Sequence, residues 1–292
     1  MRHDPDDDDL PSDPPAIEAR GLVREYAGTR ALDGLDLEVR RGECFGLLGP
    51  NGAGKTTTIR ILSTLDAATS GEARVLGLDP RADAELLRAR IGVVPQELAL
   101  YEDLSGRENL RFFGQLYGVE RRRLEERVER ALEWSGLAER AASRVSTWSG
   151  GMKRRLNLVA ALMHEPELVF LDEPTVGIDP QSRNRVFEMV EDLRARGVTL
   201  IYTTHQLGEV ERLCERALIL DRGRAIAAGT LAELRRASGG ARGRARLAVG
   251  DRADDARSLL EAHGIPCALE EQELALEDVF LALTGRALRD ER

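Results

Sequence analysis

Residues 49–57 of the sequence, GPNGAGKTT, have the residue types and spacing of a loop that binds phosphate. Gly49, Gly54, Lys55 and Thr56 fill the pattern G-x-x-x-x-G-K-[ST]. Glycines allow the positive φ angles that turn successive backbone N–H groups toward an anion. Lys55 can then reach the β- and γ-phosphates of a nucleotide, and the Thr56 hydroxyl can bind Mg²⁺. The loop residues that we expect around the phosphates are Gly49, Asn51, Gly52, Ala53, Gly54, Lys55, Thr56 and Thr57.

The lysine in this loop is itself informative, because Lys55 and Lys153 are the only lysines in the sequence. A chain that uses arginine for nearly all of its positive charge has lysine where a compact ammonium is needed rather than a planar guanidinium. A structural glycine turn, which is the alternative interpretation, does not require a lysine there. We therefore predict a phosphate-binding loop.

Two adjacent carboxylates, Asp172 and Glu173, follow the apolar run at residues 168–171. If this run is a strand beside the phosphate loop, Asp172 lies at its tip and can hold Mg²⁺ or its bound water. Glu173 can then act on the water that attacks the γ-phosphate. A pair of residues that caps a helix is the alternative interpretation when the two are considered alone.

A second candidate phosphate site is the turn formed by Ser149, Gly150 and Gly151, ahead of a helix that we expect at residues 153–162. Backbone N–H groups at a helix N-terminus bind anions well. One ATP cannot easily use two such sites on a single subunit. The two sites therefore predict a sandwich of two subunits, in which each ATP lies between the loop of one chain and the turn of the other.

The elements that must position these residues alternate between strands and helices. The apolar run at residues 44–48 precedes the phosphate loop, and the residues after the loop have the spacing of a helix. We expect further strands at residues 17–26, 31–40, 168–171, 200–203 and 217–220, and helices at residues 183–196 and 206–214. Such alternation predicts an α/β fold with a buried, largely parallel sheet and helices on its faces.

The domain organisation follows from changes in composition along the chain. Residues 1–15 are acidic and Pro-rich and are expected to form a disordered tail. Residues 16–235 are expected to form the main domain, with a helical subdomain at about 83–165. Residues 236–244 are typical of a linker, and residues 245–292 are expected to form a small C-terminal domain.

Composition restricts the class of function. The net charge of −9 argues against a protein that acts mainly on nucleic acid. No apolar run approaches the ~18 residues that span a bilayer, so we expect any membrane pore to be formed by another chain. The first 15 residues have no apolar stretch, so we do not expect them to form a secretory signal. The cysteines Cys44, Cys214 and Cys267 lack metal-site spacing, so we expect reduced thiols in the cytosol.

With these motifs in this order, residues 17–235 resemble the nucleotide-binding subunit of an ABC transporter. The resemblance implies the P-loop NTPase fold of an ABC cassette, with a mixed sheet core and a helical subdomain, followed by a small α+β C-terminal appendage. It implies ATP and Mg²⁺ as cofactors and ATP hydrolysis as the activity. It further implies that Tyr26 stacks on adenine and that Gln96 senses Mg²⁺ and the membrane partner.

The same resemblance implies roles for the remaining motifs. Glu173 matches the catalytic glutamate, and His205 matches the switch histidine that contacts the γ-phosphate. Residues 177–179 match the loop that contacts the opposite subunit. WSGGM at residues 148–152 matches the signature motif, with Trp148 in place of the usual Leu and Met152 in place of the usual Gln. Because Ser149 and Gly151 are retained, we expect an active site with altered packing at the signature helix.

Within that family, residues 49–62, 149–156 and 172–180 resemble drug- and antibiotic-resistance exporter ATPases, as does the C-terminal stretch LEDVFLALTGR. This resemblance implies an ATP-dependent homodimer that powers a separate polytopic membrane permease, which docks near residues 96–117. It implies export of a drug, an antibiotic or a lipid-like substrate. The expected location is cytoplasmic, peripheral on the inner face of the cell membrane.

Two other classes of protein fit the sequence less well. A soluble ABC ATPase of repair or translation would need tandem cassettes, a long coiled-coil insertion or zinc cysteines, none of which the sequence contains. A P-loop kinase or GTPase does not explain the Ser-Gly-Gly turn, and the base-reading motif NKxD is missing.

Overall fold

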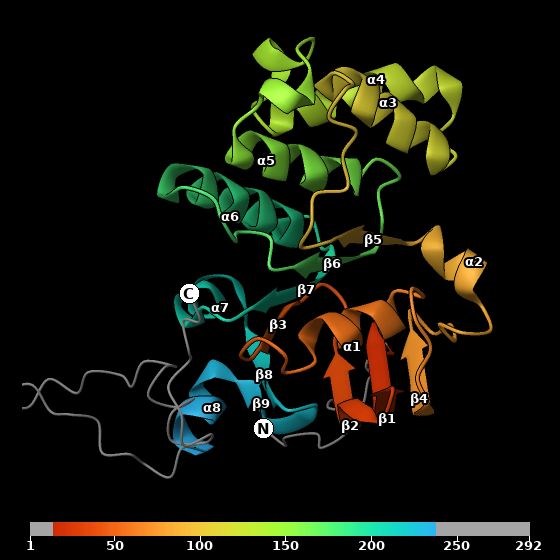
Figure 1. Ribbon diagram of the computed structural model, residues 1–292, viewed down its shortest axis with the longest axis vertical. Helices are drawn as coiled ribbons and strands as arrows, with labels where there is room; N and C mark the ends of the chain where they lie inside the picture. Colours follow the sequence, from red (N-terminus) through yellow and green to blue (C-terminus); the bar gives the residue numbers. More distant parts are fainter. Residues whose placement is uncertain (1–13, 238–292) are drawn as a thin grey trace, which may run out of the picture.

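The computed structural model of the protein describes residues 14–237. The expected C-terminal domain and nearly all of the expected tail and linker lie outside these residues. The described chain has two sheets with helices between and around them (Figure 1). The helices are α1 Lys55–Leu62, α2 Ala84–Arg88, α3 Gly106–Leu116, α4 Arg121–Trp134, α5 Gly150–Ala160, α6 Pro180–Ala195, α7 Leu207–Leu213 and α8 Leu231–Ala237, with short 3-10 turns at Ala138–Arg140 and Val145–Thr147.

The larger sheet has six strands in the order β5-β6-β7-β3-β8-β9. Its neighbouring strands are parallel except for the last pair, which is antiparallel. The central strands β3, β6 and β7 are fully buried, as expected for strands covered on both faces. The bounds are β3 Cys44–Leu48, β5 Ile91–Val94, β6 Leu168–Asp172, β7 Thr199–Thr204, β8 Arg216–Asp221 and β9 Arg224–Thr230.

The register of this sheet brings three chemically important segments together. Leu48 at the end of β3 pairs with Thr204, and Asp172 at the end of β6 pairs with Thr203. The phosphate loop, the two carboxylates and His205 therefore all follow the carboxyl ends of adjacent parallel strands. This edge is where open α/β sheets bind their ligands.

The smaller sheet is antiparallel and has the order β2-β1-β4. Its strands are β1 Ile17–Tyr26, β2 Thr29–Val39 and β4 Ser70–Val75. Helix α1 lies between the two sheets, and its Ile59 and Ile61 pack in one buried cluster with Phe45 and Phe170 of the larger sheet (Figure 1). The helix that starts at the phosphate loop is thereby fixed from both sides.

Helices α3, α4 and α5 gather at the end of the molecule opposite the smaller sheet (Figure 1). Ser105 starts α3 with a capping box, in which its side chain accepts a hydrogen bond from the Glu108 N–H and the Glu108 carboxylate accepts one from the Ser105 N–H. A second apolar cluster joins these helices to the other face of the six-stranded sheet through α6 and α7. The expected α/β fold with a helical region is confirmed.

Several elements differ from the sequence expectation. The stretch at 83–165 is not helical throughout, because β5 Ile91–Val94 is a strand of the main sheet. Its four residues are too few to show a strand period among helices. Strands β4 and β9 were not predicted either. Both lie at the edges of the sheets, and their residues are mostly exposed or half-buried.

The described thiols are free, as expected. Cys44 and Cys214 are buried with their Sγ atoms 3.8 Å apart, and Cys267 lies outside the described residues. The hydrogen bond with Cys44, together with burial, raises the pKa of the Cys214 thiol well above its ordinary value. Within residues 14–237, no helix is both long enough and apolar enough to cross a membrane.

Candidate functional site

The phosphate loop connects β3 to α1 and depends on two glycines for its shape. Gly54 has φ 111°, and a Cβ there would lie 2.7 Å from the Ala31 carbonyl oxygen. A Cβ on Gly49 would overlap the carbonyl oxygen of Leu220. Only glycine fits at both positions. A tightly wound loop of this kind can turn successive backbone N–H groups toward a bound anion.

A cavity of about 560 Å³ opens over this loop, which is within the usual size of a small-molecule site. Its lining brings together the residues predicted from separate parts of the sequence. These are Tyr26, Asn51, Gly52, Ala53, Gly54, Lys55, Thr56, Thr57, Gln96, Glu173 and His205, together with Ala31, Pro50 and Val176. Gly49 and Asp172 do not line the cavity but directly precede residues that do.

Lys55 crosses the loop and meets the carboxylate expected to act on water. Its Nζ donates hydrogen bonds to the carbonyl oxygens of Gly49 at 2.8 Å and Pro50 at 3.1 Å. The same Nζ lies 3.0 Å from Glu173 Oε1, and both side chains are buried. The single lysine of the loop is therefore positioned between phosphate loop and carboxylate.

Asp172 and Glu173 share one partner, Thr203 of the neighbouring strand β7. The Thr203 hydroxyl donates to Asp172 Oδ1 at 2.7 Å and accepts a hydrogen bond from the Glu173 N–H at 3.0 Å. Glu173 has φ 46°, a left-handed conformation that is uncommon for a residue with a side chain. Such conformations cluster at functional sites when the surroundings hold them. Sequence analysis did not identify Thr203.

His205 follows β7 and lies next to Glu173 in the lining of the cavity. Its Nδ1 lies 3.5 Å from Glu173 Oε2, and the ring is partly exposed. The N–H of Gly49 donates to the carbonyl oxygen of Thr204 at 3.4 Å, so the chain next to His205 is tied to the start of the phosphate loop.

Tyr26 ends β1 at the rim of the cavity. Its hydroxyl donates to Asp66, and the guanidinium of Arg24 lies 4.4 Å from the centre of its ring. Arg24 also forms an ion pair with Asp66 at 2.7 Å. The hydrogen bond from Tyr26, together with the charge of Arg24, holds the pKa of Asp66 below its ordinary value. The side chain is thus held by two neighbours, while Tyr26 as a whole remains 38% exposed.

Gln96 lies in an exposed loop whose main chain is held by Arg154 of α5. The Arg154 guanidinium donates to the carbonyl oxygens of Gln96 at 2.8 Å, Pro95 at 3.3 Å and Val176 at 3.4 Å. Burial lowers the pKa of Arg154. One buried side chain therefore connects α5, the loop of Gln96 and the loop that follows Glu173. Sequence analysis did not identify Arg154.

Ser149, Gly150 and Gly151 lie at the start of α5 and do not line the cavity. The Ser149 side chain caps the helix by accepting a hydrogen bond from the Met152 N–H at 3.3 Å. Ser149 and Gly150 are exposed, whereas Gly151 is buried, and a Cβ there would overlap the Ser182 side chain.

The two unusual signature residues are both accommodated by packing. Trp148 is buried, its Nε1–H donates to Ser143 Oγ at 2.8 Å, and its ring occupies the space left by the missing side chain of Gly106. Met152 is partly buried against the apolar cluster of the helical region.

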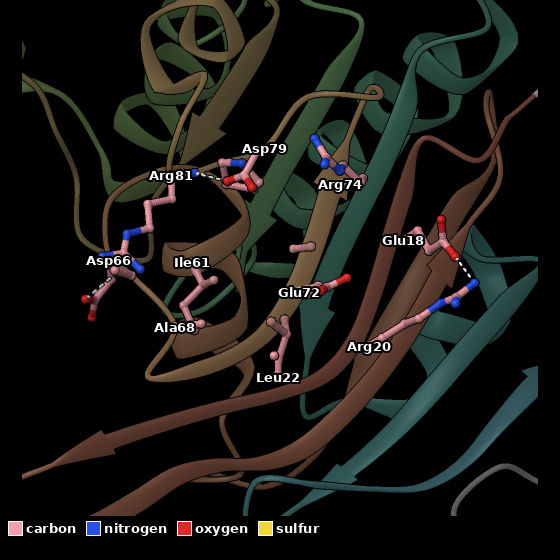
Figure 2. Close-up of a pocket in the computed structure, with 14 residues that line it drawn as sticks. Glu18, Arg20, Leu22, Ile61, Asp66, Ala68, Glu72, Arg74, Asp79 and Arg81 are labelled. Carbon is pink, nitrogen blue, oxygen red and sulfur yellow. Dashed lines mark hydrogen bonds and ion pairs between the residues drawn. The ribbon is translucent and has the colours of Figure 1, made fainter.

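A second cavity, of about 490 Å³, lies beside β1, β4 and α1 (Figure 2). Figure 2 shows charged side chains of both signs around it, including the ion pair of Arg20 with Glu18. It shares no lining residue with the cavity over the phosphate loop. None of the sequence motifs reaches it, so we do not assign the chemistry to this cavity.

Comparison with known proteins agrees with the geometry of the loop cavity. Residues 32–176 match the model of the family described as ABC transporter. The linearmycin resistance ATP-binding protein LnrL of Bacillus subtilis (strain 168) is 47% identical over 218 residues, which cover 75% of this chain and 70% of LnrL. The chain belongs to the ABC transporter family. It is an ATPase with the fold of an ABC cassette, as the sequence motifs predicted.

Further relatives of this ABC ATPase include other resistance and export proteins. The daunorubicin/doxorubicin resistance ATP-binding protein DrrA of Streptomyces peucetius is 44% identical over 85% of this chain and 75% of DrrA. The Nod factor export ATP-binding protein I of Paraburkholderia xenovorans (strain LB400) is 46% identical over 73% of this chain and 70% of that protein. A solved ATP-binding subunit of an ABC transporter superposes with a TM-score of 0.70 at 33% identity, over 77% of this chain and 93% of that one.

Proposed function

We propose that this ABC ATPase powers an exporter whose membrane pore is a separate permease, and that the cargo is a drug, an antibiotic or a lipid-like molecule. The observation that carries this proposal is the similarity to relatives named for linearmycin resistance, daunorubicin resistance and Nod factor export. The alternative, a soluble ABC ATPase of repair or translation, is favoured by no observation in the described residues.

We assign the chemical step to Lys55, Glu173 and His205. Glu173 orients and polarises a water for in-line attack on the γ-phosphate, because its carboxylate faces the cavity beside the loop. Lys55, 3.0 Å from Glu173, and His205 stabilise the charge of the transferred phosphoryl group. The backbone of residues 49–57 holds the remaining phosphates, with Gly49 to Thr57 in the roles expected from the sequence.

The residues expected to bind Mg²⁺ fit that ion. Thr56 and Gln96 line the cavity, and Asp172 precedes Glu173 with its Oδ1 fixed by Thr203. All three offer oxygen atoms, which Mg²⁺ prefers, and Mg²⁺ commonly keeps only one or two protein ligands beside phosphates and water. When bound there, the ion would supply positive charge that stabilises the phosphates.

We assign adenine binding to Tyr26. Its ring lies at the rim of the cavity, partly exposed and held by Arg24 and Asp66. Proteins commonly bind a base by stacking it on an aromatic ring, without hydrogen bonds that distinguish one base from another.

We further propose an ATP-dependent homodimer. Ser149, Gly150 and Gly151 form the start of α5 outside the cavity of their own chain, and the first two are exposed. In a dimer this helix N-terminus contacts the γ-phosphate of the ATP bound to the partner.

The permease is proposed to dock on residues 96–117. This segment exposes Tyr101, Phe112, Leu116 and Tyr117, and the rings of Tyr101 and Phe112 pack edge to face with centroids 4.6 Å apart. Apolar patches of this kind typically mark protein–protein contacts. Docking there places the ATPase on the cytoplasmic face of the membrane, and no role for nucleic acid is proposed.

The test is to purify the full chain with Glu173→Gln from its own host in mild detergent with Mg-ATP, and to identify bound proteins by mass spectrometry. We expect a stoichiometric polytopic membrane protein, which is lost with Leu116→Asp. Leu86→Asp is the matched control, because Leu86 on α2 has the same exposed fraction of 64% as Leu116. Recovery of ribosomal or repair proteins instead would favour the soluble alternative.

A further inference from the structure

Glu209 is a buried carboxylate on α7 whose partners are three hydroxyl groups. It is only 4% exposed. The hydroxyl of Thr175 donates to its Oε1 at 2.6 Å, and those of Thr204 and Tyr202 donate to its Oε2 at 2.8 and 3.1 Å. Within residues 14–237, no ion pair includes Glu209. Sequence analysis gave this residue no role, and it does not line the nucleotide cavity.

A carboxylate buried without a cation must be satisfied by hydrogen bonds, because desolvation of the charge is otherwise very unfavourable. Hydroxyl donors to a carboxylate form short, strong bonds, as at Thr175. Burial and the neighbouring Glu209 raise the pKa of Tyr202 well above its ordinary value, so its hydroxyl keeps the proton that it donates. The cluster is therefore a specific arrangement of donors around one acceptor.

One side of the cluster holds the turn that carries His205. The Thr204 hydroxyl that donates to Glu209 also accepts a hydrogen bond from the Gln206 N–H at 2.9 Å. Thr204 and Gln206 flank His205 in the chain, so this hydroxyl fixes the backbone on both sides of the imidazole. Glu209 determines the orientation of the hydroxyl by accepting its hydrogen bond.

The other side holds the turn that carries Glu173. The N–H of Val176 donates to the carbonyl oxygen of Glu173 at 3.2 Å, which closes a turn over residues 173–176. Thr175 lies inside this turn and donates to the other oxygen of Glu209. Each oxygen of one carboxylate thus anchors a different turn, and the two turns bring Glu173 Oε2 within 3.5 Å of His205 Nδ1.

We propose that Glu209 is a positioning residue for ATP hydrolysis, which sets the placement of Glu173 relative to His205 by holding both of their turns. The inference rests on the roles proposed above for these two residues. Glu209 itself is proposed to contact neither ATP nor the attacking water. We expect its effect to be on the catalytic step more than on nucleotide affinity, because none of the hydroxyl groups that bind Glu209 belongs to the phosphate loop or to Tyr26.

The test compares Glu209→Gln with Glu211→Gln in the full chain. Glu211 lies on the same helix and forms an ion pair with Arg235 away from the cavity, so it controls for loss of a charge on α7. In Glu209→Gln, the side-chain NH₂ group cannot accept a hydrogen bond, so one side of the cluster is left with donors facing donors. We expect kcat at least ~10-fold lower with KM for ATP changed less than ~3-fold in Glu209→Gln, and wild-type kinetics in Glu211→Gln.

A second readout reports the position of His205 without turnover. The imidazole NMR signals of His205, assigned by their loss in His205→Ala, should shift in Glu209→Gln and stay unchanged in Glu211→Gln. If Glu209→Gln does not fold, Thr175→Val removes one hydroxyl and keeps the shape of the side chain. We expect that variant to lose at least ~5-fold in kcat at unchanged KM.

A parallel measurement on Glu173→Gln separates failure of this inference from failure of the proposed function. If Glu173→Gln is inactive but Glu209→Gln, or Thr175→Val in its place, keeps wild-type kcat and unshifted His205 signals, the positioning role is wrong and the site assignment stands. If Glu173→Gln hydrolyses ATP at the wild-type rate, the assignment of Glu173 fails first, and the positioning role fails with it.

Discussion

Lys55 Nζ and Glu173 Oε1 lie 3.0 Å apart in a buried ion pair, although the two residues are far apart in the chain. Parallel pairing through β7 links the ends of β3 and β6 and creates this contact. A phosphate that enters the loop meets Lys55 and the carboxylate together. Binding of ATP is therefore expected to depend on Lys55 and its hydrolysis on the neighbouring Glu173. Substituting one residue at a time distinguishes the two contributions.

Lys55→Met should weaken ATP binding. A hydrogen bond to a charged group contributes ~1.5–3 kcal/mol, so we expect the Kd for ATP to rise about 10- to 100-fold. Lys153→Met is the matched control, because the other lysine of the sequence pairs with Glu102 and does not line the cavity. Equilibrium binding to fluorescent ATP measures both, and equal affinities in the two variants would contradict the phosphate role of Lys55.

Tyr26 should act through its ring more than through its hydroxyl. Stacking with a base contributes ~1–3 kcal/mol, so Tyr26→Ala should raise the Kd for ATP about 10-fold. Tyr26→Phe removes the hydrogen bond to Asp66 but keeps the ring beside Arg24, and its Kd should change less than ~3-fold. Fluorescence titration with ATP distinguishes the two, and equal losses in both variants would assign the effect to the hydroxyl.

Trp148 and Gly106 should be energetically coupled. A Cβ on Gly106 would overlap the Trp148 ring, so Gly106→Ala should destabilise the protein by about 1–3 kcal/mol. Trp148→Leu, which restores the residue usual in the family, removes the overlap. In that background Gly106→Ala should cost at least ~1 kcal/mol less. Urea unfolding of the wild type, the two single variants and the double variant measures this coupling. Additive effects would mean that the Trp148 ring does not occupy the space beside Gly106.

The phosphate loop and the two carboxylates were predictable because their spacing carries the chemistry within short segments. His205 was predicted only from the resemblance to ABC transporter subunits. Gly49, Gly54 and Lys55 are a local pattern, and the apolar strands on either side gave the order of elements. The helical region that contains α3, α4 and α5 and the main strands of the larger sheet were likewise predicted from local periodicity. The strand β5 was not, because four residues carry too little pattern.

Thr203, Glu209 and Arg154 could not be predicted, because their partners are distant in the sequence. Thr203 meets Asp172 through the pairing of β6 with β7, and Arg154 reaches from α5 to the carbonyl oxygens of Gln96 and Val176. A threonine in a buried strand or an arginine in a helix has no local signal of such a role. Only the packed sheet and the position of α5 determine these contacts.

The most direct test of the catalytic role of Glu173 is the rate of ATP hydrolysis by Glu173→Gln, with Glu167→Gln as a control at an exposed acidic residue just before β6. Removing a general base typically lowers the rate ~10²–10⁴-fold, and Gln has nearly the same size and shape as the Glu that it replaces. We predict that Glu173→Gln binds ATP with the wild-type Kd and hydrolyses it at least ~100-fold more slowly. Hydrolysis at the wild-type rate would contradict the claim that this carboxylate, paired with Lys55, performs the reaction.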